Sequence, residues 1–256
     1  MLQDVEVRVL FWAPILQKAA FGRLFAFPAL VALTLAACGS NPFAILDERN
    51  EALAIHLHKN DLPAGLNLGP VVAIDTETMG LNPMRDRLCV VQLSDGKGDA
   101  HLVQIAKGQT SAPNLERLLT DPAVLKLFHF GRFDVAALKQ AFGVLTAPVW
   151  CTKIASKLIR TYTDRHGLKY LLAEYVGVDV SKAQQTSDWG STNLTDAQKE
   201  YAASDVLYLH KLKAALEAIL IREGRLDLAQ RCFDFLPTRA ELDLLGWEEP
   251  NDLFHH

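Results

Sequence analysis

Acidic residues at three places along the chain have the types and spacing that metal-dependent chemistry requires. Asp75 and Glu77 are separated by one residue at the end of the apolar run Val71–Ile74. Because side chains alternate along a strand, both carboxylates are expected on the same face. Two like charges repel each other unless protons or a cation intervene, and carboxylate oxygens suit Mg²⁺ or Mn²⁺. A solvated strand end explains a single such pair equally well, so the interpretation depends on further carboxylates converging there.

Two further groups place carboxylates where a sheet would meet its helices. Asp134 follows the apolar run Val124–Phe128 and begins a segment with helical apolar spacing. A helix dipole also favours a carboxylate at such a position, so Asp134 alone decides nothing. Tyr201 and Asp205 are four residues apart in a helical segment and therefore share one face. An amphipathic helix with a buried tyrosine and an exposed aspartate explains that pair without chemistry.

The elements that must position these groups follow from apolar periodicity and from turn signals. The segment 88–105 is typical of a hairpin, which predicts a mixed sheet in an α/β domain. Thr195 is the predicted N-cap of a long helix. Strands are predicted at residues 55–58, 71–78, 88–94, 101–105 and 124–128, and helices at 113–119, 134–142, 154–159, 168–176, 195–221 and 226–235. The tail after the last helix is predicted to be loose and acidic.

Composition bounds the class of protein. The 256 residues have room for one sizeable domain or two small ones, and half of them are hydrophobic, which predicts a real core. The net charge of −4 argues against binding nucleic acid through a bulk positive field, although bound divalent ions would offset acidic residues locally. The four cysteines form no C-x-x-C pair, so buried free thiols are expected rather than a disulfide framework.

Two segments have a composition that suggests contact with nucleic acid. Residues 153–169 are rich in Lys and Arg, with Asp164 as the one acid. This bias is typical either of a phosphate contact or of an ordinary solvated helix face. The polar stretch 181–194 is long for a loop in a compact domain, which favours a functional loop. Its Trp189 either stacks on a base or anchors the loop to the core, and we predict the anchor.

Residues 1–50 differ from everything after them. Leu24–Ala37 is an apolar run too short to span a bilayer comfortably, and it ends at Cys38 in a pattern typical of an exported lipoprotein. The alternative is an extension outside the natural mature protein, such as a start assigned too early, with Leu53 as a candidate true start. We favour the extension. This choice predicts a cytoplasmic protein with no stable membrane association and one domain over residues 51–256.

Three blocks in order, Asp75-x-Glu77, His129-x-x-x-Phe133-Asp134 and Tyr201-x-x-x-Asp205, together resemble the motifs of the DEDD exonuclease superfamily in its tyrosine-containing branch. Within that branch the chain resembles the catalytic domain of ribonuclease D over roughly residues 55–220. The phrases DTET and YAASDVLYLHKL add detail to this resemblance. His129 stands where many members have asparagine. The chain also ends too early for the helical nucleic-acid-binding modules that usually follow, so a role in tRNA maturation is not assumed.

The resemblance implies a ribonuclease H-like fold, with a mixed sheet of five to six strands flanked by helices. It also implies two Mg²⁺ or Mn²⁺ ions held by the four acids. By analogy, Asp75 would bridge both ions and Asp134 would hold one of them. Glu77 and Asp205 would complete the other.

The resemblance also implies roles around the metals. Tyr201 would orient or help to activate the attacking water, although a phenol of ordinary pKa is a poor base. The 3′-terminal nucleotide would lie beside the first motif. The candidate substrate contacts there are Thr78, Met79 and Leu81, with His129 and Phe133 from the second motif.

The predicted function is a metal-dependent 3′–5′ exonuclease acting on single-stranded RNA or DNA 3′ ends, with RNA favoured. The alternative is a catalytically silent domain of the same fold that binds nucleic acid or a protein. Such a domain has no physical reason to keep four mutually repelling carboxylates together. An endonuclease is disfavoured because Tyr201 and the spacing of the last block match the exonuclease branch. No residue pattern fixes the oligomeric state, the preferred metal or the biological substrate.

Overall fold

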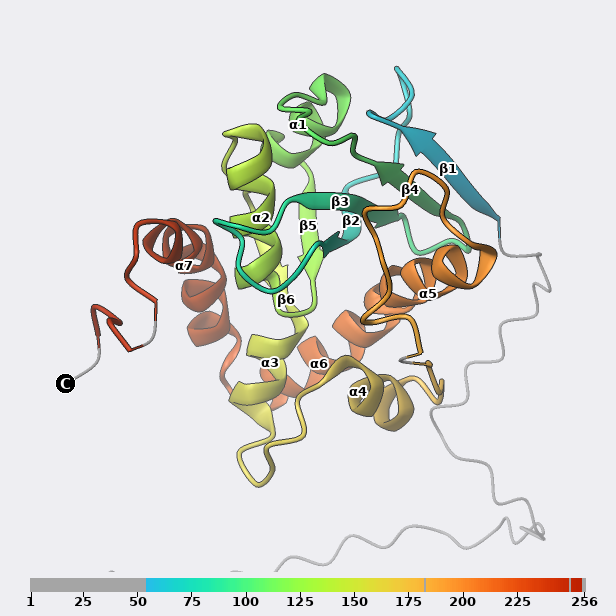
Figure 1. The fold of residues 1–256 in the computed structure, drawn as a ribbon. Helices are drawn as coiled ribbons and strands as arrows, with labels where there is room; N and C mark the ends of the chain where they lie inside the picture. The colour runs from blue at the N-terminus through green and yellow to red at the C-terminus, as the bar shows by residue number, and fades with distance from the viewer. Residues whose placement is uncertain (1–53, 182, 249, 255–256) are drawn as a thin grey trace, which may run out of the picture. The chain divides into compact units, whose positions relative to one another are not determined.

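The computed structural model describes residues 54–181, 183–248 and 250–254, and a six-stranded sheet in this part of the chain carries the first acidic motif (Figure 1). The strand order is β1-β4-β3-β2-β5-β6, so β2 has a neighbour on each side. The strands are β1 (Ile55–Lys59), β2 (Val71–Thr78), β3 (Leu88–Ser94), β4 (Ala100–Gln104), β5 (Leu125–Phe128) and β6 (Val149–Cys151).

The sheet is mixed, as the sequence predicted. Strands β2, β3 and β4 form an antiparallel meander, in which Asp75 of β2 pairs with Gln92 of β3. Strands β5 and β6 are parallel to β2, and β1 is parallel to β4 at the edge of the sheet. The predicted hairpin and edge strand are confirmed. Strand β6 escaped prediction because its three residues are too few to show an alternating pattern.

Helices cover both faces of the sheet. Figure 1 shows α2 and α5 on opposite sides, with α2 packed on β2, β3, β5 and β6 and α5 packed across β1 to β4. Because side chains alternate along β2, Asp75 and Glu77 point to the face of α5, whereas Thr76 points to the face of α2. The helices are α1 (Pro113–Thr120), α2 (Gly131–Phe142), α3 (Thr152–Ile159), α4 (Leu168–Tyr175), α5 (Asp196–Leu207), α6 (Leu209–Arg222) and α7 (Leu226–Leu244).

The core lies between the sheet and these helices, and it contains the apolar part of β2. Val72, Ala73 and Ile74 are fully buried, which fixes the strand that ends in the acidic motif. Trp189 is also buried, and it packs with Val90, Leu102 and other apolar side chains under α5. The predicted anchor role of this tryptophan is confirmed. The predicted apolar stripe of α6 is fully buried as well: Leu209, Leu212, Leu216 and Leu220.

The helix predicted over residues 195–221 is in fact two helices. Helix α5 ends at Leu207 and α6 begins at Leu209, with Tyr208 between them at φ −102° and ψ −1°. No Gly or Pro marks this break in the sequence. Its reason is tertiary, because α5 packs across the sheet while α6 packs mainly on α3, α4 and α7. The N-cap prediction is confirmed, since Thr195 and Gln198 form a capping box.

Helix α7 is longer than the predicted 226–235 and continues past Pro237 to Leu244. A proline inside a helix removes a backbone hydrogen bond and is locally costly. Ion pairs hold the second half of α7 in place. Arg132 of α2 donates to both oxygens of Asp243 at 2.5 and 2.7 Å, and Arg239 contacts the same carboxylate at 3.0 Å. The end predicted to be loose is therefore partly a helix joined to α2.

The predicted leader, residues 1–50 with Cys38, lies outside the described residues. Within the described ranges, no helix is both long and apolar enough to cross a membrane. Cys89, Cys151 and Cys232 are free thiols, and the first two are buried as expected.

Candidate metal centre

Three carboxylates from two elements converge at the end of β2. Asp75 and Glu77 come from β2 and Asp205 comes from α5, and one oxygen from each lies within 4.8 Å of the others. The alternation of β2 gives the first two a common face. The packing of α5 on that face brings the third beside them. Residues far apart in the sequence thus form one small acidic site, which we call the acidic triad.

The loop before α5 fixes the position of this helix. Gln198 donates hydrogen bonds to the Ser187 hydroxyl and to the Asp188 carbonyl, both at 3.1 Å. The buried Trp189 ring packs on Tyr201 with the ring centroids 6.0 Å apart. The loop 181–194 therefore positions the helix that carries Asp205.

Burial and mutual repulsion raise the pKa values of Asp75 and Glu77. For Asp75, burial is the largest cause, and the charge of Asp134 raises the pKa further. Asp205 and Glu77 add to the same shift. Burial raises the pKa of Glu77 to about 9, with contributions from the charges of Asp205 and Asp134. A cation among these oxygens would favour their ionised forms and so reverse the shifts.

Asp134 approaches the triad from the other face of the sheet. It is 3% exposed, lies in the first turn of α2, and accepts a 2.6 Å hydrogen bond from the Thr76 hydroxyl. Burial raises its pKa to about 7, and the hydrogen bond from Thr76 opposes that rise. Within the described residues, the group of mutually close oxygens does not include Asp134, although its charge acts on Asp75 and Glu77. The structure therefore places Asp134 beside the triad and holds it separately.

A tight turn before α2 positions Asp134 beside the triad. Helix α2 begins at Gly131, three residues earlier than predicted, directly after Phe130, whose φ of +64° is unusual for a bulky residue. A Cβ on Gly131 would lie 2.7 Å from the Cβ of Phe128, so only glycine permits the helix to start this close to β5. The turn consequently holds the first turn of α2 against the end of β5.

Tyr201 is placed to donate a hydrogen bond rather than to accept a proton. Its side chain is hydrogen-bonded to Asp205. Burial raises the pKa of the Tyr201 phenol, and the charges of Asp205, Glu77 and Asp75 raise it further. The phenol is thus neutral at any working pH and can hold a water or a carboxylate by its O–H.

The donor set of the acidic triad fits a hard divalent cation. Carboxylate oxygens are the ligands that Mg²⁺ and Mn²⁺ prefer, whereas imidazole and thiolate favour Zn²⁺ and similar ions. Among the described residues, no His or Cys joins the mutually close group. Burial, and after it the neighbouring acids, raise the pKa values of Asp75 and Glu77, so ionising all of these carboxyl groups together is unfavourable. Such an arrangement is stable on ionisation only when a cation binds.

The predicted substrate contacts beside the first motif differ in exposure. The Thr78 hydroxyl donates to the Gly80 carbonyl and is therefore engaged within the turn. Leu81 is 89% exposed, and Met79 is 51% exposed. A Cβ on Gly190 would lie 2.5 Å from the Met79 sulfur. The absence of a side chain at Gly190 therefore lets the loop before α5 approach the turn after β2. Leu81 is thus an apolar side chain presented to solvent next to the acids.

The predicted contacts from the second motif are less accessible. His129 is half-buried, and its Nδ1 lies 2.8 Å from the Thr152 hydroxyl. Burial lowers the pKa of His129 to about 3, with Lys153 adding to the shift, so the ring is neutral. Phe133 is half-buried in the first turn of α2.

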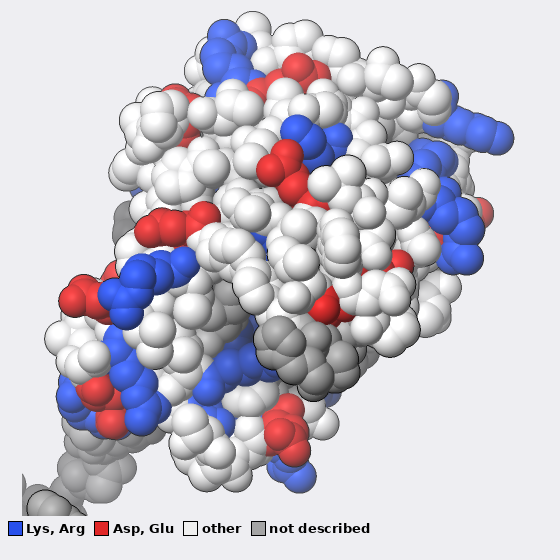
Figure 2. All heavy atoms as spheres, turned by 90° about the vertical axis from the view of Figure 1, so that its left-hand side faces the viewer, with Lys and Arg blue, Asp and Glu red and all other residues white. Residues whose placement is uncertain are grey.

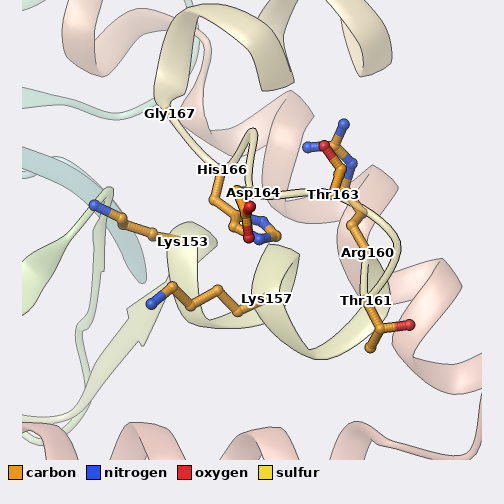
Figure 3. A pocket seen from close by; sticks show the side chains of 8 residues that line it. All are labelled: Lys153, Lys157, Arg160, Thr161, Thr163, Asp164, His166 and Gly167. Carbon is orange, nitrogen blue, oxygen red and sulfur yellow. The ribbon is translucent and has the colours of Figure 1, made fainter.

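An open cavity of about 480 Å³ lies over α3 and the loop that follows it (Figure 3). Figure 3 shows Lys153 and Lys157 extending in the same direction, away from Arg160. The Lys153 ammonium lies 3.8 Å from the ring centroid of Phe130, so the cavity adjoins the turn that precedes Asp134. The lining residues are Lys153, Lys157, Arg160, Thr161, Thr163, Asp164, His166 and Gly167.

The basic segment predicted from the sequence divides into two kinds of residue. Arg160 pairs with Glu174, and Lys169 pairs with Asp179, so both have structural partners. Of the other three, Arg165 stacks on the Tyr170 ring and does not line the cavity, which makes Lys153 and Lys157 the stronger candidates for a phosphate contact. Figure 2 shows acidic and basic side chains intermixed over much of one face, with Lys and Arg gathered in a hollow in its lower half. Positive charge on this face is local, in keeping with the net charge of −4.

Two polar residues beside the site escaped the sequence analysis. Thr76 lies between the two acids of the first motif and holds Asp134. Gln92 lies on β3 opposite Asp75 and is fully buried. The available signal was a polar side chain inside an otherwise buried strand. That signal does not tell a structural polar residue from a functional one.

Comparisons with known proteins bear on this site. A sequence model described as 3′–5′ exonuclease matches residues 49–221. Ribonuclease D of Acidiphilium cryptum is 37% identical over 188 residues, which cover 73% of this chain and 46% of that protein. The chain thus spans about half the length of the curated relatives it matches.

Two solved structures match over almost all of their own length. NrnC of Brucella melitensis bound to pGG is 59% identical, has a TM-score of 0.76, and is covered over 100% of its chain by 80% of this one. The same Brucella protein with bound Mg²⁺ is 59% identical with a TM-score of 0.74, and the match covers 79% of this chain and 99% of that one.

Proposed function

The chain belongs to the 3′–5′ exonuclease family, and on this premise we propose that it hydrolyses short single-stranded nucleic acids from the 3′ end, RNA in preference to DNA, with two divalent metal ions. The observation that carries the proposal is the acidic triad, in which oxygens of Asp75, Glu77 and Asp205 lie within 4.8 Å of one another. The raised pKa values of Asp75 and Glu77 support a site that needs a cation. The similarity to a Brucella structure with bound Mg²⁺ supports the choice of metal.

The residues have distinct roles in this proposal. The triad binds metal, and Asp134 holds a second ion from its separate position. Divalent ions at such a site supply a deprotonated water, stabilise charge at phosphorus and assist the leaving oxygen. Tyr201 orients the attacking water and does not deprotonate it, because its raised pKa makes it a poor base. The water oxygen bonds to phosphorus as the bond to the 3′ oxygen of the preceding nucleotide breaks, which releases a nucleoside 5′-monophosphate.

Surfaces near the acids support a short substrate. The exposed Leu81 lies just beyond β2, where it can pack on a base, and the half-exposed Met79 lies beside it. Thr78, His129 and Phe133 stay predicted contacts. Lys153 and Lys157 line the cavity next to the Phe130 turn and can receive phosphate oxygens. The pGG bound in the Brucella neighbour supports a substrate only a few nucleotides long.

A ladder experiment tests the proposal. RNA and DNA oligonucleotides of matched sequence, from two to about twenty nucleotides and labelled at the 5′ end, are incubated with the full chain and Mg²⁺ or Mn²⁺. We expect products shortened stepwise from the 3′ end, with the shortest RNA consumed fastest and no products in EDTA. Binding without shortening supports a catalytically silent domain, and internal fragments support an endonuclease. Either of these two results overturns the proposal.

A further inference from the structure

Gln92 is a buried side chain whose polar atoms have no partner. It lies in the middle of β3 and is fully buried. Among the described residues, neither its Oε1 nor its Nε2 has a hydrogen-bond partner. Proteins rarely bury an amide in this way, because a lost partner costs free energy that a water-exposed amide does not lose. A residue of this kind requires a reason.

The register of the sheet places Gln92 beside the acidic triad. Gln92 pairs with Asp75 across the antiparallel strands β3 and β2. Directly opposed residues share one face of the sheet, with Cβ atoms about 4.5–5.5 Å apart. Helix α5, which carries Asp205, covers this face. The Gln92 carboxamide is therefore enclosed between the sheet and α5, next to a proposed metal ligand.

The other strand neighbours of Gln92 on this face are apolar or already hydrogen-bonded. On β3, Val90 is apolar, and the Ser94 hydroxyl already donates to the Asp99 carbonyl at 2.7 Å. On β4, the residue opposite Gln92 is Leu102. Across the strand pair, the acceptor directly opposite Gln92 is the carboxylate of Asp75.

We propose that Gln92 is a positioning residue for the metal centre: with divalent ions bound, its Nε2 donates to Asp75 and fixes the orientation of that carboxylate. A carboxylate that binds a metal retains lone pairs, and hydrogen bonds to them hold the ligand in its binding geometry. This inference rests on the proposed function, because it assumes that Asp75 binds metal. It gives a partner to a buried amide whose polar atoms otherwise have none.

The variant Gln92→Met tests the inference, because methionine has a similar length and no polar atoms. We expect Mg²⁺ affinity, measured by calorimetric titration, to fall about tenfold or more. The melting temperature of the metal-free protein should stay the same or rise, because a buried unpartnered amide has been removed. Gln92→Leu, which leaves more room, should behave in the same way. Mg²⁺ affinity within twofold of the wild type in a folded variant overturns the inference, as does a fall in metal-free melting temperature without a loss of affinity.

Gln104→Met is the matched control. Gln104 is a buried glutamine on the same face, but it donates to the Ser191 carbonyl at 2.7 Å and accepts from Lys59. This variant should show the opposite pattern, with a lower melting temperature and unchanged Mg²⁺ affinity. The two proposals fail differently. A wild-type protein that binds no Mg²⁺ removes the proposed function, whereas normal Mg²⁺ binding by Gln92→Met removes the positioning role alone.

Discussion

Lys126 and the acidic triad are two charged regions of the same domain, the first fully buried and the second half-buried, and their surroundings differ. Lys126 of β5 is fully buried, and burial lowers its pKa to about 8. Its ammonium has three donor hydrogens, and the protein supplies three acceptors. These are the carbonyl oxygens of Asp121, Val124 and Ala147, at 2.7, 2.8 and 2.5 Å. Asp75 and Glu77 of β2 instead face other acids, which raise their pKa values.

The difference separates a structural charge from a functional one. All three hydrogens of the Lys126 ammonium have acceptors within the protein, and these hydrogen bonds connect two loops to the start of β5. The triad is incomplete without a cation, so the folded chain holds it at a cost to its own stability. Removing charge from the two regions should therefore change stability in opposite directions.

The variants Asp75→Asn and Asp205→Asn should have the largest effect. A metal ligand contributes several kcal/mol to transition-state stabilisation, so we expect turnover to fall by at least about 10³-fold. The melting temperature of the metal-free variants at pH 8 should rise, since a repelling charge is lost. Oligonucleotide shortening and thermal melts in EDTA measure the two effects.

Glu200→Gln is the control for these acids, because Glu200 is an exposed residue of α5 next to Tyr201. It should leave turnover and metal-free stability close to wild type. Retained turnover in Asp75→Asn or Asp205→Asn would contradict the metal assignment.

Removing the charge of Lys126 should have the opposite effect on stability. Lys126→Met leaves three carbonyl oxygens without a donor, so we expect a loss of about 3 kcal/mol in the free energy of unfolding. Mg²⁺ affinity should stay the same, because the ammonium acts on loops rather than on the triad. Urea unfolding measures the loss, with the exposed Lys107→Met as the control. A Lys126→Met protein as stable as the wild type would show that the carbonyls find other partners.

The two regions also differ in how far the sequence predicts them. The sequence predicted the acids because a spacing of two, in Asp75 and Glu77, is typical of one face of a strand, and a spacing of four, in Tyr201 and Asp205, is typical of one face of a helix. The apolar run Val71–Ile74 located the strand. Lys126 gave no signal, since a single lysine in a short strand is equally compatible with an exposed edge. Asp134 was predicted to hold one of the two ions, but the sequence did not reveal that Thr76, between Asp75 and Glu77, donates a hydrogen bond to it.

Local pattern therefore predicted the elements, and tertiary packing decided the remainder. The break at Tyr208 follows from α5 and α6 packing on different partners, which the continuous leucine spacing did not reveal. The extension of α7 past Pro237 depends on ion pairs from Arg132 of α2 to Asp243, a contact between distant segments. The position of Gln92 opposite Asp75, and the lack of a hydrogen-bond partner for its buried amide, depend on the register of β2 and β3 and cannot be read from the sequence.

The stability of the metal-free protein should fall as pH rises. Glu77 has a folded pKa of about 9 against 4.5 in the unfolded chain, and Asp134 has about 7 against 3.8. Between pH 6 and 8 the folded state thus binds more protons than the unfolded state, and each pH unit lowers its stability. We expect a loss of about 4 kcal/mol over this range.

Excess Mg²⁺ should flatten this pH dependence, because the cation favours the ionised carboxylates. Unfolding curves at pH 6, 7 and 8, with EDTA and with Mg²⁺, measure the difference. Metal-free stability that is constant or rises across this range would show that the acids are already ionised without metal.

The variant Tyr201→Phe should have the smallest effect on turnover. It tests whether the Tyr201 phenol acts in the chemical step or in metal binding by the triad. The raised pKa of Tyr201 makes the phenol a hydrogen-bond donor, worth about 1 kcal/mol, rather than a base. We therefore expect kcat to fall about tenfold, with KM and Mg²⁺ affinity unchanged. The pH profile of kcat should keep its shape, because a residue that only orients water adds no titration of its own. A profile that loses one limb in the variant would instead make Tyr201 a proton acceptor, and weakened Mg²⁺ binding would make it a partner of Asp205 in holding the ion.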